Sequence, residues 1–131
     1  MEFLELKKEL KQAVEQAEEY AIASLQSSND FFPYIFSGDK KIKKIIEDTI
    51  DDAIEIAHEE IEDMEEETVI FVYKEAIELA DGKFDAIVTQ VFNDDEDHGY
   101  SFALIYRIIN NKISFLNQRV SLGNIRNVLI F

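Results

Sequence analysis

The chain has 131 residues, 47% of them apolar, and a net charge of −15 from 28 acidic and 13 basic residues. That length suits a single domain, residues 1–131, and the apolar share is ordinary for a folded protein and too high for a disordered one. The acidic balance argues against nucleic acid and anionic membranes as partners, because both require a dense basic patch.

What the chain lacks excludes further classes. There is no cysteine, which rules out disulfides, thiolate metal sites and a cysteine nucleophile and mildly favours the cytoplasm. The first residues mix Glu and Lys with apolar residues, unlike a signal peptide, and no apolar run approaches the ~18 residues that span a bilayer. We therefore expect a soluble, cytoplasmic protein.

The N-terminal segment is predicted to form an amphipathic helix that fades near Ser27–Asp30. Its apolar residues alternate between spacings of three and four, as on one stripe of a helix: Phe3, Leu6, Leu10, Ala13, Ala17 and Tyr20. The aromatic segment Phe31–Phe36 follows. It contains Pro33, which cannot donate a ladder hydrogen bond, so we expect an edge strand or an extended connector. Its rings either offer a docking surface or cover one end of the core.

A second amphipathic helix is predicted from about Lys40 to about Glu66. Its apolar stripe has the same helical spacing: Ile42, Ile46, Ile50, Ala53, Ala57, Ile61 and Met64. Two long helices joined by a short aromatic segment most simply form an antiparallel pair that lies on one face of a sheet.

From Thr68 the apolar period changes to two, which indicates strands. Asp81-Gly82 is a strong two-residue hairpin signal, and with this turn Leu79 would oppose Phe84. One face of this hairpin is assigned to the core, under the helices: Phe71, Tyr73, Ile77, Leu79, Phe84, Ala86, Val88 and Phe92.

The remaining chain is predicted to add further strands. Tyr100–Ile109 is apolar on both faces, which predicts a central strand that is covered on each side. Asn110-Asn111 is predicted to be a tight turn, and strands are expected at Lys112–Val120 and Ile125–Phe131. The predicted fold class is therefore α+β, with two long amphipathic N-terminal helices packed on one face of a four- to five-stranded, mainly antiparallel meander sheet.

The stretch Lys74–Arg107 resembles a family of uncharacterised small bacterial α+β domains. The resembling pieces are Asp81-Gly82-Lys83 in a hairpin turn, Asp85-Ala86-Ile87-Val88, and an aromatic strand that ends Ile105-Tyr106-Arg107. In addition, Phe32-Pro33-Tyr34 stands where such chains often carry an aromatic residue beside proline. The resemblance covers under half of the chain. It implies a helical N-terminal half followed by an antiparallel sheet, and it implies no activity.

The charge on the second predicted helix is the most unusual feature of the sequence. Residues 47–67 hold 12 acidic residues and no Lys or Arg, and an i, i+4 ladder runs through Glu47, Asp51, Glu55, Glu59 and Asp63. Like charges at this spacing cost ~0.2–0.5 kcal/mol per pair. A basic partner protein would offset that cost and would be steered by the charge. A solvated face that maintains solubility is the alternative.

No sequence pattern predicts catalysis or a metal site. Glu55 and His58 form a single Glu-x-x-His pair, whereas di-iron bundles need two. Glu62 stands where a His-Glu-x-x-His motif needs its second histidine. The loop Asp94–Gly99 lacks oxygen ligands at two positions that a calcium loop requires. We therefore expect no metal, no cofactor and no enzymatic activity.

One carboxylate is out of place on the predicted sheet. Glu75 shares the core face and lies near Gln90, and Arg119 would be its partner if the hairpins align. A carboxylate in such a position indicates either a buried ion pair or a ligand pocket.

The residues support three hypotheses about function. The first is a non-enzymatic acidic domain that binds a basic protein, for instance as an immunity-type antagonist of a basic toxin, through Glu55, Glu59, Glu62 and Asp63. The second is a small-molecule-binding or enzymatic domain with a pocket between helices and sheet at Glu75, Gln90 and Arg119. The third is a homodimeric structural or adaptor protein that associates through the sheet face opposite the helices, with Ile87, Val91 and Ile105.

Overall fold

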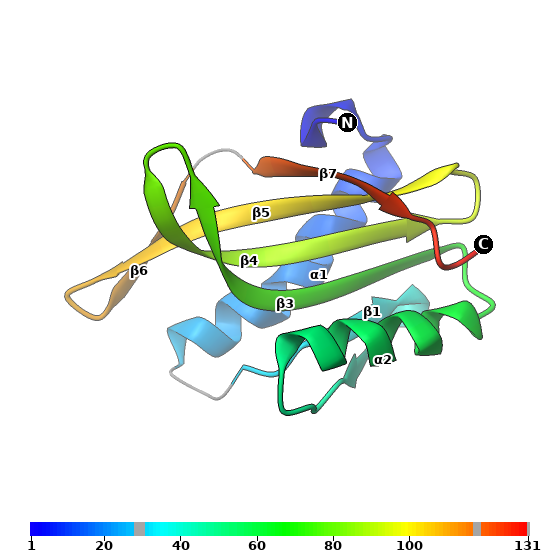
Figure 1. The fold of residues 1–131 in the computed structure, drawn as a ribbon, viewed down its shortest axis with the longest axis horizontal. Coiled ribbons are helices and arrows are strands. Elements are labelled where there is room, and N and C mark those ends of the chain that lie inside the picture. Colours follow the sequence, from blue (N-terminus) through cyan, green and yellow to red (C-terminus); the bar gives the residue numbers. More distant parts are fainter. Residues whose placement is uncertain (28–30, 117–118, 131) are drawn as a thin grey trace.

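The computed structural model describes residues 1–27, 31–116 and 119–130, which form two α-helices and seven strands of one antiparallel sheet (Figure 1). The helices are α1 (Lys8–Gln26) and α2 (Ile50–Glu62), and single 3₁₀ turns cover Phe3–Glu5 and Gly38–Lys40. No helix in these ranges is long and apolar enough to cross a bilayer. The strands are β1 (Tyr34–Ser37), β2 (Lys41–Lys44), β3 (Thr68–Leu79), β4 (Gly82–Asn93), β5 (His98–Ile109), β6 (Lys112–Phe115) and β7 (Val120–Arg126).

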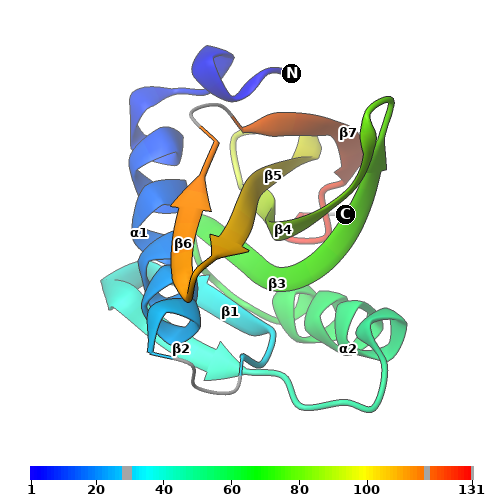
Figure 2. The same cartoon turned by 90° about the vertical axis from the view of Figure 1, so that its left-hand side faces the viewer.

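The sheet is curled into half of a barrel, as an end-on view shows (Figure 2). Its strands are ordered β2-β1-β3-β4-β5-β6, and β7 also pairs with β5. One edge of β5 pairs with β4, and the other edge is shared by β6, beside Tyr106–Ile109, and β7, beside His98–Ala103. Residues 99–106 of β5 are all buried. The predicted central strand with both sides covered is therefore confirmed.

The chain after β5 is organised differently from the prediction. Asn110 and Asn111 do form the predicted tight turn, and their φ angles of 52° and 65° are those that asparagine tolerates in hairpin turns. The predicted strands Lys112–Val120 and Ile125–Phe131 are replaced by the shorter β6 and by β7, which begins earlier. Residues 117, 118 and 131 lie outside the described part of the chain.

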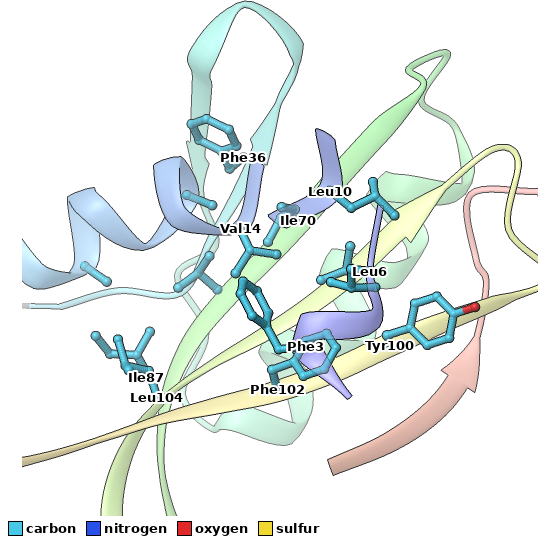
Figure 3. Packing of buried hydrophobic residues seen from close by; sticks show 14 of the residues in the cluster. Phe3, Leu6, Leu10, Val14, Phe36, Ile70, Ile87, Tyr100, Phe102 and Leu104 are labelled. Carbon is cyan, nitrogen blue, oxygen red and sulfur yellow. The ribbon is translucent and has the colours of Figure 1, made fainter. Parts of the chain in front are cut away.

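The two helices cover opposite faces of the sheet. Alternate residues of a strand point to opposite faces, and two separate clusters result. On one face, α1 packs with Phe3 and Leu6 against Phe36, Ile70, Val72, Ile87, Val91, Phe102 and Leu104 (Figure 3). On the other face, α2 packs through Ala53, Ala57 and Ile61 against Val69, Phe71, Tyr73, Ala86, Val88 and Phe92.

The predicted fold class is thus wrong in its arrangement. The helices do not share a face, the described sheet has seven strands rather than four or five, and the second helix is Ile50–Glu62 rather than Lys40–Glu66. Helices on both faces follow from β3, β4 and β5, whose buried residues lie on both sides, because each apolar face of a sheet requires its own cover.

A local turn explains why the second helix begins late. After Gly38, Lys40 adopts a φ of 59°, and the chain reverses so that β2 pairs with β1. The helix starts only after Thr49, whose side chain accepts a hydrogen bond from the backbone N–H of Asp52 at 3.1 Å. The isoleucines of residues 40–46 have helical spacing, but the pairing of β2 with β1 overrides it, and Thr49 caps the helix at a later position. Ile42, assigned to the helix stripe, is consequently exposed.

The β3–β4 hairpin has the predicted strands but a register shifted by two residues. Its turn residues are Ala80 and Asp81, so Leu79 pairs with Gly82 rather than with Phe84. Gly82 has a φ of 126°, which glycine adopts without the steric cost that a side chain brings. A shift of two residues leaves every side chain on its original face. The predicted core face is therefore confirmed, although α2 alone covers it.

Strand β1 lies between β2 and β3, so the predicted edge strand is an inner one. Its aromatic residues are buried, as expected if they cover the core rather than dock a partner. The Tyr34 hydroxyl donates to the carbonyl of Ala17 and accepts from the N–H of Ala21. Burial raises the pKa of Tyr34 above its ordinary value. This contact fixes β1 to the middle of α1.

Candidate functional site

The solvent side of α2 carries the acidic ladder. Because Ala53, Ala57 and Ile61 are buried against the sheet, the carboxylates on the other side of the helix point to solvent. Asp52 is one of these exposed carboxylates, and the five others together are called the acidic face: Asp51, Glu55, Glu59, Glu62 and Asp63. The four residues predicted to contact a partner therefore lie on one accessible surface.

Few cations balance the acidic face. Arg126 of β7 pairs with Glu62, with 2.8 Å between Nη2 and Oε1, and Lys43 of β2 pairs with the adjacent Glu60. Within the described ranges no other carboxylate of α2 makes an ion pair. Both pairs are largely exposed, so each contributes at most about 1 kcal/mol. Most of the negative charge is left for solvent or for a partner.

The acidic face weakens its own helix. Between Asp51 and Asp63 there are three i, i+4 carboxylate pairs, which cost ~0.2–0.5 kcal/mol each and about 1 kcal/mol together. The ladder is one pair shorter than predicted, because Glu47 precedes the helix. Glu59 and Glu62 also lie near the C-terminal end, where the helix dipole favours cations, and the last turn contains no basic residue.

His58 lies on the inner side of α2, toward the sheet. Its Nε2–H donates to Oε1 of Gln90 on β4 at 2.7 Å, and its ring meets Phe92 edge-on at 5.8 Å. Nearby, burial raises the pKa of Tyr73 to about 12. Glu55 is exposed, and no group of three or more metal-ligating side chains occurs in the described residues. His58 therefore anchors α2 to the sheet.

The most buried ion pair of the described chain joins α1 to the segment before β7. Arg119 Nε lies 3.0 Å from Glu18 Oε2, and Nη2 of the same arginine donates to Oε1. The two side chains are only 18% and 2% exposed. The guanidinium also lies over the Phe3 ring, 4.3 Å from its centroid, in a cation–π arrangement.

The two members of this pair respond differently to burial. Burial raises the pKa of Glu18 above its ordinary value, because the loss of solvation outweighs the hydrogen bond and charge of Arg119, which lower it. The hydrogen bond that Arg119 donates to Glu18 raises the pKa of Arg119, against a smaller lowering by burial. The arginine thus stays charged, and its hydrogen bond and charge offset part of the cost of burying the Glu18 carboxylate.

The three residues predicted to line a pocket do not meet. Glu75 is exposed on β3, Gln90 bonds to His58 on the α2 side, and Arg119 pairs with Glu18 rather than with Glu75. Four surface hollows of 170 to 520 Å³ lie elsewhere and have other linings.

The residues of the predicted dimer face are divided between the two cores. Ile87 and Val91 are buried in the cluster under α1, and Ile105 is buried in the cluster under α2. They therefore form no common exposed surface.

Two structural residues were missed at the level of sequence. Thr49 has the signature of an N-cap, because it precedes an amphipathic helix and stands three residues before the acidic Asp52. Glu18 follows Val14 by four residues, which places it beside the buried side of α1. A carboxylate at such a spacing signals a buried partner. Neither signal names Arg119, because that residue lies 101 positions away.

Comparisons with protein-family models, with curated proteins and with solved structures found no match. The resemblance of Lys74–Arg107 to small bacterial domains gains no support from a family model, so function is inferred from the acidic face and its surroundings.

Proposed function

We propose that this chain is a non-enzymatic binding domain whose acidic face contacts a basic protein. The observation that best supports this is the acidic ladder itself, which continues to the C-terminal end of α2 although it destabilises the helix there. A cationic partner would offset that repulsion and would be steered toward it. Solubility alone does not require the acidic residues to gather on one helix. In this chain they do gather there, and strands β5, β6 and β7 contain no acidic residue.

The contact is proposed to involve Glu55, Glu59, Glu62 and Asp63. A helix from Asp51 to Asp63 rises about 18 Å, which is long enough to cover a cationic groove on a partner. Glu62 is held by Arg126, so an incoming arginine would compete with an internal one at that end. The finer proposal is an immunity-type antagonist that covers the basic surface of a toxin protein, such as the nucleic-acid-binding groove of a nuclease.

The test is capture of partners from the source cell by the tagged chain, with elution by rising salt. Three proteins are compared: the unchanged chain, the acidic-face variant E55K/E59K/D63K, and the control variant E9K/E19K/E78K. The control carboxylates are exposed and make no ion pair in the described residues. Both variants change the net charge equally, so the comparison separates local charge from total charge.

The expected result is a basic protein that is released stepwise by salt, is retained by the control variant and is lost from the acidic-face variant. Circular dichroism must show that both variants are folded. A partner that binds the acidic-face variant as well as the unchanged chain would contradict the proposal. So would a partner lost equally from both variants, because total charge alone would then explain the binding.

A further inference from the structure

The positive charge of this acidic chain is concentrated on one strand. Lys40, Lys41, Lys43 and Lys44 supply four of the 13 basic residues within five positions, and all four are exposed. Lys43 pairs with Glu60, and Lys44 lies 6.0 Å from the centroids of two aromatic rings. The other two make no ion pair with the described residues. Because neighbouring residues of a strand point to opposite faces, Lys41 and Lys43 lie on the α2 face of β2, whereas Lys44 lies on the α1 face. We call these three lysines of β2 the basic strip, and Lys40 lies in the turn before it.

Strand β2 is also the last strand at its end of the described sheet (Figure 2). A terminal strand presents backbone N–H and C=O groups that can pair with another extended segment. Lysine on such a strand often serves to prevent this pairing. However, β6 at the opposite end carries a single lysine, Lys112. Protection of an edge therefore does not account for four lysines.

A groove lies against the same strand. It has a volume of about 520 Å³ and lies between the β1–β2 hairpin and the end of α2. Ile35, Ile42 and Met64 contribute apolar surface to it, whereas Lys41 and Glu66 contribute charge. Ile42 is 39% exposed. The groove gives an added strand room for side chains on the α2 face, as in other cases where a peptide extends a sheet.

We propose that β2 accepts an extended, acidic segment of a partner protein as an additional strand. Backbone hydrogen bonds to the free edge of β2 hold the segment, its carboxylates meet Lys41 and Lys43 on the α2 face, and its alternate apolar side chains lie on the α1 face beside Ile42. The complementary charge identifies the occupant as acidic. This site uses cations and the sheet edge, so it is independent of the proposed contact between the acidic face and a basic protein.

The test uses a fluorescein-labelled peptide of about seven alternating glutamate and valine residues, enough to cover the four residues of β2. Binding is measured by fluorescence anisotropy with the unchanged chain, with K41Q/K43Q, and with the matched control K83Q/K112Q. The control removes the same charge from exposed positions elsewhere. Two further peptides are N-methylated, one at every valine and one at every glutamate, because alternate N–H groups of a strand point to opposite edges.

The expected result is saturable binding that K41Q/K43Q weakens about tenfold and that the control changes by less than about twofold. At least one N-methylated peptide should lose binding. Three results would overturn the proposal: no binding of the peptide to the unchanged chain, equal weakening by the two variants, or unchanged affinity of both N-methylated peptides. The last would show attraction between charges without strand pairing.

Discussion

Replacing Arg119 with methionine removes the partner of a carboxylate that has almost no contact with solvent. Methionine retains much of the length and apolar surface of the arginine, so packing over Phe3 is partly preserved. The hydrogen bonds and charge are lost. Glu18 would then be buried in the middle of α1 without its arginine partner, at a side-chain exposure of 2%.

The expected loss of stability follows from the difference in burial between Glu18 and Arg119. Breaking a buried pair by removal of one member costs about 3–5 kcal/mol, because the other charge is left uncompensated. R119M should reach this range. E18Q should cost less, about 1–2 kcal/mol, because the amide oxygen still accepts a hydrogen bond and Arg119 is 18% exposed and can reach water. The double variant E18Q/R119M leaves no buried charge and should be more stable than R119M alone.

The pH dependence has a definite sign. Because the pKa of Glu18 is raised in the folded state, the fold binds that proton more tightly than the unfolded chain does. Its protonation therefore stabilises the fold below the ordinary pKa, and this contribution is lost as pH rises through the raised value. In R119M the hydrogen bond and charge that lower the pKa are absent, so the loss extends to higher pH.

The assay is urea unfolding followed by circular dichroism, from about pH 7 to about pH 5. The free energy of unfolding of R119M should rise as the pH falls, relative to E18Q/R119M, which shares the remaining titrating groups but lacks Glu18. If R119M and E18Q are equally unstable, or if R119M and the double variant have parallel pH profiles, the reasoning about a buried, uncompensated carboxylate is refuted.

Three further predictions concern the helices and one turn. Glu59→Lys should raise the free energy of unfolding by about 1 kcal/mol, since it relieves like-charge repulsion and suits the helix dipole; a lower urea midpoint would contradict this. Tyr34→Phe should cost about 1–3 kcal/mol in urea unfolding by removing the hydroxyl between Ala17 and Ala21, and a cost near zero would show that the contact is not stabilising. Asn111→Gly should be neutral or stabilising by up to about 0.5 kcal/mol in thermal unfolding, since its φ is 65°, and a clear loss would refute the turn assignment.

Local patterns predicted some elements of this fold well. Strand β5 was predictable because both of its faces are apolar, and the turn at Asn110-Asn111 because asparagine tolerates a positive φ. Strand β2, which contains three of the lysines of residues 40–44, was not predictable in this way. The spacing of Ile42, Ile45 and Ile46 fits a helix. The pairing that overrides it comes from β1, which begins directly after Pro33 and was itself not clearly predicted as an inner strand.

The candidate site, too, was predictable only where a local pattern encodes it. The acidic ladder was visible because it repeats every four residues on a single helix. The pairing of Glu18 with Arg119 was not visible, because it joins segments 101 residues apart, and no local pattern encodes such a distance. The position of the helices on opposite faces was in principle deducible, since buried residues alternate on both sides of β3 to β5.

The same long separation has a consequence for synthesis of the chain. A ribosome releases α1 early, and the β3–β4–β5 meander can pair soon after it emerges because its contacts are local. Glu18 has no arginine partner until Arg119 has been synthesised. The carbonyl of Met1 likewise cannot accept its hydrogen bond until the hydroxyl of Ser121 is present, 120 residues later. Any chain that stops short of this point lacks the arginine that neutralises the inner carboxylate of α1. Such a chain would expose an amphipathic helix to chaperones and proteases, so that the last strands distinguish a finished molecule from an unfinished one.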